Sequence, residues 1–308
     1  MINLLYCANA KVFDGIMLSL MSCTAKTKSA ITAYIMTMDL RNLNENYVPI
    51  QQKHVDILNA VIKKENKDNK AVLIDATDVF NQKMGNSPNL KTGYTPYTLL
   101  RLLACEFDLP EKILYVDADT MFNGDIAEIL KYDIDNCEFA GVLDYLGKRF
   151  IRKDYINAGV LYLNIKRIKR TGLFDKAMHV CLHNEMIFPD QDAINDLVQF
   201  KLILPREFNE QHKWRKTTII QHFAKTMSFF PVIKVINVKQ WQIELVKKQL
   251  KVRAYNDVYD KFIELRKEYG KDFLEPLKVY KVPNIFQRMK YTVREIRSYV
   301  RKNGGVYR

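Results

Sequence analysis

The sequence of 308 residues has few cysteines and no long apolar run. Its five cysteines are an odd number without any Cys-x-x-Cys pair, which excludes a zinc ribbon and a disulfide scaffold. We expect buried thiols in a reducing compartment, at Cys7, Cys23, Cys105, Cys137 and Cys181. No stretch of about 18 uncharged apolar residues occurs, so the sequence offers no bilayer-spanning helix.

The N-terminus also lacks the basic region, apolar core and small-residue cleavage site of a secretory signal. We therefore expect a mature cytoplasmic start. A content of 48% hydrophobic and 27% charged residues excludes a disordered or low-complexity chain. The length suits one large domain or one domain with an appendage, because single cores stop growing near about 250–300 residues.

The net charge of +13 is concentrated at the C-terminal end. Residues 281–308 carry eight basic side chains and one acid, Glu295. Such an asymmetry favours a basic tail that acts on an anionic surface.

Short β-branched or aromatic runs alternate with helix-period segments over the first 220 residues, which predicts an α/β fold with a largely parallel sheet. We expect strands at 3–7, 32–38, 71–75, 113–116, 139–143, 159–164 and 217–221, and helices at 51–64 and 95–105. Beyond residue 231 the pattern becomes helical, with helices at 241–252, at 255–269 and from Asn284. We place a domain boundary near residue 245, between a catalytic domain of residues 1–245 and a helical basic region of residues 246–308.

Two acids, Asp117 and Asp119, end the apolar run 113–116. At the carboxyl end of a buried strand, such a pair would line the crevice where open α/β sheets bind ligands. Magnesium and manganese prefer oxygen ligands and often bridge carboxylates to substrate phosphates. The pair therefore predicts a metal-bridged diphosphate, with a solvated turn as the alternative.

Five ordered blocks of the chain resemble glycosyltransferase family 8, the retaining nucleotide-sugar enzymes that include glycogenin and bacterial lipooligosaccharide galactosyltransferases. The blocks lie between about residues 2 and 241, and they are Tyr97–Leu103, Leu114–Thr120, Asn157–Val160, Phe188–Asn195 and Ile219–Phe223. The resemblance implies a Rossmann-like nucleotide-sugar-binding sheet of the GT-A type and a retaining hexosyltransferase that uses a UDP-sugar.

The resemblance also implies a role for each matched residue. Asp117, Asp119 and His222 would bind manganese, with magnesium as the alternative, and this mixture of oxygen and imidazole ligands suits manganese better than calcium. Residues expected to bind the nucleotide-sugar donor are Cys7, Ala8, Asn9, Arg101, Asp117, Ala118, Asn157, Ala158 and Lys239, of which Asn157 and Ala158 would lie around the sugar. Gln191 and Asp190 would also surround the donor sugar, and Asp144 would lie near the sugar and the acceptor. Glutamine is a poor nucleophile, so we expect same-face attack by the acceptor.

Each block has a structural alternative as well. His222 stands among apolar residues, where a core histidine is common, and Asp190 precedes a helical pattern that it could simply cap. The Asn157 block could be a tight turn before a strand. Arg101 lies in an apolar helix, so it needs an acid or a phosphate as partner, and a structural ion pair would satisfy that need. Asp144 could be a solvated loop acid.

The chain departs from the family at two places. Asn9 and Val12 stand where the family has an acid and a tyrosine, which leaves Phe13 as a candidate to stack on the base. After His222 the usual lysine spacing is changed, and we prefer Lys239 over Lys225 for the diphosphate.

The C-terminal segment repeats apolar residues at helical spacing, with arginines on its other faces. The apolar residues are Ile285, Met289, Val293, Ile296 and Val300. A basic amphipathic helix of this kind favours an anionic membrane surface, with packing on the catalytic domain as the alternative. No stacking motif or reading helix accompanies the charge, so we expect no nucleic-acid partner.

The sequence thus predicts a cytoplasmic enzyme, peripheral at the inner face of the cell membrane. It would transfer galactose or glucose from UDP-galactose or UDP-glucose to a lipid-linked or cell-surface glycan, or alternatively to a glycan on protein serine or threonine. Two rival functions stay open. A metal-dependent nucleotidyltransferase would release pyrophosphate, and a non-catalytic glycan- or membrane-binding protein would bind a UDP-sugar without turnover.

Overall fold

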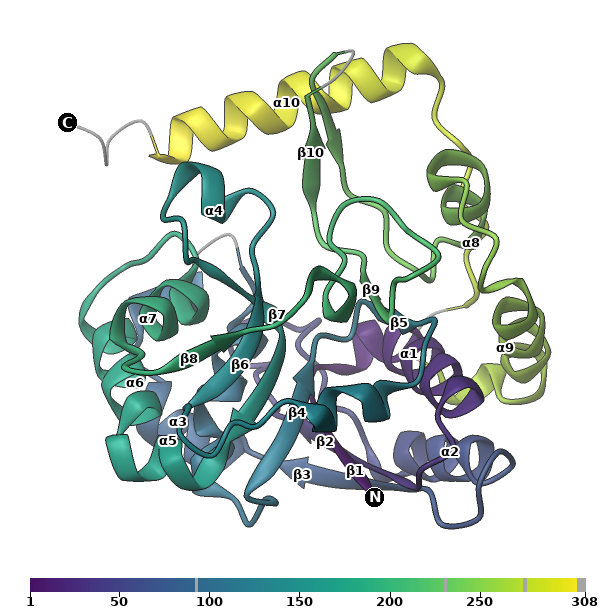
Figure 1. Ribbon diagram of the computed structural model, residues 1–308. Coiled ribbons are helices and arrows are strands. Elements are labelled where there is room, and N and C mark those ends of the chain that lie inside the picture. Colours follow the sequence, from purple (N-terminus) through teal and green to yellow (C-terminus); the bar gives the residue numbers. More distant parts are fainter. Residues whose placement is uncertain (92–93, 230–231, 274–275, 304–308) are drawn as a thin grey trace.

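The fold is a central sheet covered on both faces by helices (Figure 1). The computed structural model describes residues 1–91, 94–229, 232–273 and 276–303, the last five of them by their backbone alone. The strands are β1 (Ile2–Cys7), β2 (Ile31–Thr37), β3 (Lys70–Asp75), β4 (Lys112–Val116), β5 (Thr120–Phe122), β6 (Phe139–Leu143), β7 (Ile156–Asn164), β8 (Lys201–Ile203), β9 (Ile220–His222), β10 (Thr226–Ser228) and β11 (Lys234–Ile236).

Helices fill the connections between the strands. The α-helices are α1 (Phe13–Lys26), α2 (Gln52–Ile62), α3 (Thr77–Met84), α4 (Gly147–Phe150), α5 (Ile165–Thr171), α6 (Leu173–His183), α7 (Pro189–Leu197), α8 (Ile243–Leu245), α9 (Asn256–Glu268) and α10 (Ile285–Asn303). The 3₁₀ helices are η1 (Ala10–Val12), η2 (Pro88–Lys91), η3 (Pro96–Glu106), η4 (Ile126–Lys131), η5 (Arg206–Phe208) and η7 (Gly270–Asp272), and η6 (Val246–Leu250) is a π-helix.

The central sheet has the strand order β3-β2-β1-β4-β7-β6-β8 among the described residues. The four strands β3, β2, β1 and β4 are parallel, as are β6 and β8, whereas β7 runs antiparallel to both β4 and β6. The expected α/β fold with a mostly parallel sheet is therefore confirmed, with β7 as the exception.

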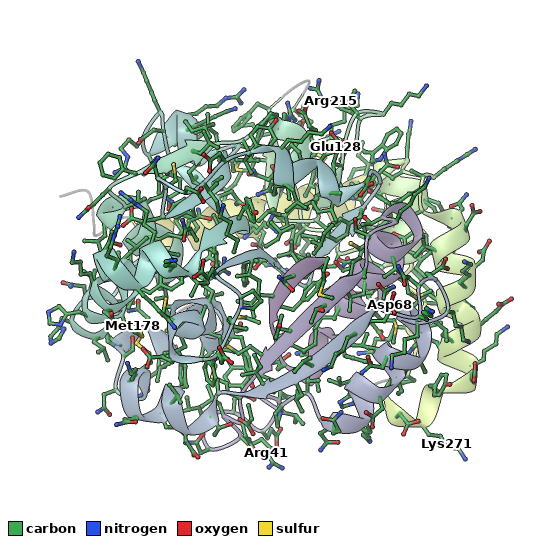
Figure 2. All side chains as sticks on the ribbon, turned by 60° about the horizontal axis from the view of Figure 1, so that its bottom comes forward. Arg41, Asp68, Glu128, Met178, Arg215 and Lys271 are labelled. Carbon is green, nitrogen blue, oxygen red and sulfur yellow. The ribbon has the colours of Figure 1, made fainter. Side chains whose placement is uncertain are left out.

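Two cores explain why the central strands are apolar at nearly every position. Leu4 and Tyr6 of β1 face the core under α1, α2 and α9, whereas Leu5 and Cys7 face the core under η3, α6 and α7. Successive side chains of a strand point to opposite faces, so a sheet covered on both faces needs apolar residues throughout. Outside this interior, labelled side chains such as Arg41 and Lys271 point outward at the rim (Figure 2).

The six strands expected in the central sheet are confirmed as β1, β2, β3, β4, β6 and β7. The strand expected at 217–221 is displaced. It forms at β9 instead and pairs with β5 in a separate two-stranded sheet. The Asn157 block is no turn before a strand, because residues 156–164 are all part of β7.

The expected helices are present with altered geometry. The helix at 51–64 is α2, and the one at 95–105 is the 3₁₀ helix η3, whose N-cap Thr95 makes no side-chain capping bond. The segment 241–252 breaks into α8 and a π-helical turn, while α9 and α10 match the last two predicted helices. The division at residue 245 stays a prediction, and α9 beyond it contributes Tyr259 and Phe262 to the same core as α1.

All five cysteines lie in the described part of the chain and are free thiols. Cys7, Cys23 and Cys181 are buried as expected, but Cys105 and Cys137 are only half-buried. Among the described residues, no helix combines the length and the apolar character that crossing a bilayer requires.

Candidate active site

The acidic pair lies at the carboxyl end of β4, where the chain turns into β5. The backbone N–H of Asp117 donates to the carbonyl of Gly159 on the neighbouring strand β7 at 2.8 Å, and the hydroxyl of Thr120 donates to the carbonyl of Asp117 at 2.9 Å. These bonds fix the turn. The two carboxylates are partly covered, with 28% and 15% of their side-chain surfaces exposed, so the alternative of a solvated turn does not describe them.

His222 reaches the acidic pair through the pairing of two short strands. In the antiparallel register of β5 and β9, Thr120 stands opposite His222, and the N–H of Phe223 donates to the carbonyl of Asp119 at 2.8 Å. The Nε2 atom of His222 lies 3.1 Å from Asp119 Oδ1 and 3.6 Å from Asp117 Oδ2. One ligand atom of each of the three residues lies within 4.8 Å of the others.

Gly159 makes room for this cluster. A Cβ atom at that position would stand 2.1 Å from Cε1 of His222 and 2.8 Å from Oδ2 of Asp117, which no side chain tolerates. The backbone of β7 therefore forms the floor beneath the imidazole and one carboxylate. Two carboxylates and one imidazole at this spacing fit manganese or a similar divalent cation.

Lys239 adds a positive charge to the same cluster. Its ammonium donates to Asp119 Oδ2 and, at 3.0 Å, to the carbonyl of Phe223. Burial raises the pKa of Asp119, but the charges of Lys239 and His222 outweigh burial and hold that pKa well below the usual range. Burial lowers the pKa of His222, whereas the charge of Asp119 raises it, and the net direction is upward. The cluster thus favours an ionised Asp119 and attracts positive charge to Nε2 of His222.

Arg101 bridges the site to the start of α7. Its guanidinium is buried and pairs with Asp117 at 3.1 Å and with Asp190 at 3.0 Å, while also donating to the carbonyl of Ala158. The guanidinium carbon stands 4.2 Å from the ring centre of Tyr115, whose hydroxyl donates to Asp117. Burial raises the pKa of Asp190, and Arg101 opposes that shift. Asp190 is therefore an ion-pair partner and not the helix cap, because the N-cap of α7 is Phe188.

The residues expected around the donor sugar lie at one edge of the cluster. The side-chain oxygen of Gln191 accepts from the N–H of Ala158 at 2.8 Å. The amide of Asn157 donates to Asp144 Oδ2 at 2.8 Å, and Asp144 Oδ1 accepts from the N–H groups of Leu146 and Gly147. β7, α7 and the segment after β6 thus meet beside the acidic pair, and Asp144 is an anchored acid.

The end of β1 also borders the site. Cys7, Ala8 and Asn9 are all buried, and the charges of Arg101, Asp117 and Asp190 act on the Cys7 thiol, whose pKa is raised mainly by burial. The Asn9 side chain accepts from the N–H of Lys11 at 3.2 Å and caps η1.

Phe13 does not present a face for base stacking. It is 2% exposed, and its ring packs against His54 and Phe273. On the other side of the acidic turn, the carbonyl of Ala118 accepts from the amide of Gln240 at 2.6 Å.

Two candidates for the diphosphate lysine lie in different places. Lys239 joins the acidic pair, whereas Lys225 pairs with Glu295 of α10 at 2.5 Å.

Two further residues of the cluster were not predicted from the sequence. Tyr115 lies inside the apolar strand β4, and Asn209 follows the short helix η5, where the sequence shows only the turn signal of Pro205. Asn209 contacts His222 and Asn157 through its side chain.

Comparisons with known proteins identify the family of this arrangement. The model of the family described as Glycosyl transferase family 8 matches residues 3–230. A lipopolysaccharide 1,2-glucosyltransferase of Escherichia coli strain K12 is 25% identical over 221 residues, which are 68% of this chain and 62% of that protein. The glycosyltransferase GlyA of Streptococcus pneumoniae serotype 4 is 27% identical over 122 residues, which are 39% of this chain and 17% of that protein. The chain thus covers less than two thirds of either relative.

Solved structures share the fold at low identity. The galactosyltransferase LgtC, solved in complex with donor and acceptor sugar analogs, superposes with a TM-score of 0.62 at 16% identity, covering 92% of this chain and 98% of that one. A structure of an active-site mutant of LgtC gives a TM-score of 0.63 at 15% identity, with the same coverage. The expected GT-A fold is confirmed by these neighbours.

Proposed function

We propose that this chain, which belongs to glycosyltransferase family 8 and is a glycosyltransferase, moves galactose or glucose from a UDP-sugar to a lipid-linked or cell-surface glycan with retention of configuration. The observation that supports the proposal is the convergence of Asp117, Asp119 and His222 from two distant segments into one cation-sized cluster. A glycan acceptor agrees with the lipopolysaccharide enzyme among the relatives.

In this proposal Asp117, Asp119 and His222 hold Mn²⁺, or alternatively Mg²⁺. The cation would supply positive charge that offsets the charge developing on the departing diphosphate. Lys239 adds a fixed ammonium on the same side. Arg101 pairs with both Asp117 and Asp190 and offsets part of their negative charge, which reduces their repulsion of the donor. With the cation bound, these groups together would present net positive charge where the leaving group departs.

The donor sugar would lie against Ala158 and Gln191, with Asp190 and Asp144 on either side. The side-chain carbonyl of Gln191 accepts a hydrogen bond from the N–H of Ala158, so the position of this side chain is fixed before substrate arrives. A carboxamide is a weak nucleophile, so we propose same-face attack by the acceptor hydroxyl, with Gln191 stabilising the positive charge on the sugar electrostatically. Cys7, Ala8, Asn9 and Ala118 would contact the nucleotide.

We further propose that α10 brings the enzyme to the inner face of the cell membrane. Exposed apolar residues on this helix are Ile285, Phe286, Met289 and Val293, with 65%, 78%, 59% and 47% of their surfaces accessible. The helix contacts the hairpin β10–β11 through polar groups, since the hydroxyl of Thr292 accepts from the N–H of Val235 and Glu295 pairs with Lys225. Within the described part of the chain the apolar face is thus exposed, as entry into a lipid surface requires. Val300, Arg301, Lys302 and Arg308 lie outside the residues with described side chains.

A hydrolysis screen tests the function without knowledge of the acceptor, because water is a default acceptor. The chain is incubated with UDP-galactose, UDP-glucose, UDP-N-acetylglucosamine and GDP-mannose, with Mn²⁺ or with EDTA. We expect UDP release from UDP-galactose or UDP-glucose that EDTA and Asp119→Ala abolish. Equal activity of Asp119→Ala would contradict the site assignment. Pyrophosphate release from a nucleoside triphosphate would favour a nucleotidyltransferase, and UDP-sugar binding without turnover would favour a non-catalytic protein.

A further inference from the structure

Asn209 links the imidazole of His222 to the opposite end of the site through a chain of hydrogen bonds. Asn209 is 1% exposed and directly follows η5 in the chain. Asn209 Oδ1 lies 3.1 Å from His222 Nδ1, and Asn209 Nδ2 donates to Asn157 Oδ1 at 2.9 Å. Asn157 in turn donates to Asp144 at 2.8 Å.

The two ends of this chain fix the orientation of Asn157. An ionised carboxylate only accepts hydrogen bonds, so the atom of Asn157 that faces Asp144 Oδ2 is the amide nitrogen. A backbone N–H only donates, so the atom that faces the N–H of Gly159 at 3.0 Å is the amide oxygen. Both ends require the same orientation.

The orientation of Asn209 follows from that of Asn157. Since Asn157 Oδ1 can only accept, Asn209 must offer its amide nitrogen there, which leaves its oxygen facing Nδ1 of His222. That oxygen only accepts, so Nδ1 must carry a proton. With its proton on Nδ1, the neutral imidazole has a bare lone pair on Nε2, facing Asp119 Oδ1 at 3.1 Å and Asp117 Oδ2 at 3.6 Å.

A lone pair directed at two carboxylates is repulsive unless a positive charge stands between them. The opposite tautomer, with its proton on Nε2, would make an ordinary histidine–aspartate hydrogen bond. It would require Asn209 to flip, and a flipped Asn209 would place two carbonyl oxygens of neighbouring amides 2.9 Å apart. The hydrogen-bond chain therefore favours the Nδ1–H tautomer of His222, whose Nε2 can bind a cation, over the Nε2–H tautomer, which would only donate a hydrogen bond to Asp119.

We infer that Asn209 is a positioning residue for the cation site: it holds His222 in the Nδ1–H tautomer and aims Nε2 at the space between Asp117 and Asp119. The inference rests on the proposed function, because it concerns the same cation. It also gives Asn157 a role in the hydrogen-bond chain, because the side-chain amide of Asn157 sets the orientation of Asn209. Partners of metal-bound histidines typically change metal affinity by about 10- to 100-fold.

The test uses the wild-type chain and four variants. In the metal-free protein, ¹⁵N NMR of labelled histidine, at a pH well above the pKa of His222, reports its neutral tautomer. The protein has five histidines, and a His222→Gln spectrum identifies the signal. Mn²⁺ affinity is measured separately by EPR titration of the wild type, Asn209→Leu, Asn209→Asp and Asn164→Leu.

We expect the Nδ1–H tautomer in the wild type and a Mn²⁺ affinity at least about tenfold weaker in Asn209→Leu. Asn209→Asp keeps an acceptor opposite Nδ1 but places its second oxygen 2.9 Å from Asn157 Oδ1, so it should recover only part of that affinity. Asn164→Leu removes another buried amide, which bonds only to backbone groups far from the site, and should leave the affinity unchanged.

An Nε2–H tautomer in the wild-type chain, or wild-type affinity in Asn209→Leu, would overturn the inference. If Asn209→Leu does not fold, the tautomer of the wild type decides. Absence of Mn²⁺ binding by a wild-type chain that shows the Nδ1–H tautomer would contradict the proposed metal dependence and not the tautomer.

Discussion

Gly159 and His222 lie so close that a methyl group on residue 159 would stand 2.1 Å from Cε1 of the imidazole. Gly159→Ala should therefore push the imidazole off its position and weaken Mn²⁺ binding by about 100-fold, at a stability cost of about 1–3 kcal/mol for overpacking. EPR titration measures the binding and urea unfolding measures the cost. Gly270→Ala is the matched control, because a methyl group there meets no heavy atom within 4 Å among the described residues. Equal Mn²⁺ affinities of the two variants would contradict the proposed site.

Lys239 should act in opposite directions on metal affinity and on turnover. Its ammonium contacts Asp119, so Lys239→Met removes a positive charge that competes with the cation, and Mn²⁺ should bind about tenfold more tightly. The same change removes a fixed charge from the proposed diphosphate position, so kcat/KM for UDP release should fall by about 100-fold. EPR titration and a UDP-release assay measure the two effects.

Lys225→Met is the control for that variant, because Lys225 pairs with Glu295 of α10. It should leave both quantities near their wild-type values. A larger loss of turnover in Lys225→Met than in Lys239→Met would reverse our assignment of the diphosphate lysine.

Mn²⁺ affinity should depend on pH through His222. The pKa of its imidazole is raised above the ordinary value of 6.5, because the charge of Asp119 outweighs burial. The metal requires the neutral imidazole, so affinity is full above the raised pKa and falls about tenfold per pH unit below it. The pKa of Asp119 lies far lower, so this carboxylate does not contribute in that range. Titration of Mn²⁺ at several pH values checks the slope, and a flat profile between about pH 5.5 and 7.5 would contradict the assignment of His222.

Arg101→Met should destabilise the fold. The substitution leaves the buried Asp190 without its guanidinium and removes the partner of Asp117, and breaking a buried ion pair costs about 3–5 kcal/mol. Urea unfolding measures the change. Adding Asp190→Asn should recover part of the loss, because no buried carboxylate then remains unpaired at that position. A loss below about 1 kcal/mol for Arg101→Met would show that the pair contributes little to stability.

The membrane proposal predicts that α10 binds anionic lipid through its basic side chains. Arg294→Glu with Arg297→Glu should weaken binding to vesicles containing phosphatidylglycerol by about 30-fold or more, since each basic residue contributes about 1 kcal/mol. Vesicle co-sedimentation measures the binding, and donor hydrolysis should be unchanged. Lys63→Glu with Lys64→Glu makes the same charge change at exposed positions after α2. Equal vesicle binding by both double variants would contradict a role for α10.

Local pattern was sufficient to predict most of the elements. The apolar runs ending at Cys7 and Val116 are strands because a doubly covered sheet needs apolar residues on both faces, and that requirement is visible along the sequence. The helical spacing of α2 and α9 is equally local. By contrast, the first three residues of β7 were missed, because Asn157 resembles a turn residue until the neighbouring strands are known.

The sequence by itself determined the α/β class and the location of two acids at the end of a buried strand, because both depend on residues close together in the chain. Only the tertiary structure decided which distant groups meet those acids. The register of β5 and β9 brings His222 to Asp119, and loop packing brings Lys239 to the site while Lys225 pairs with α10. Asn209 joins them without any local signal, because a hydrogen bond between residues far apart in sequence depends on packing and not on periodicity.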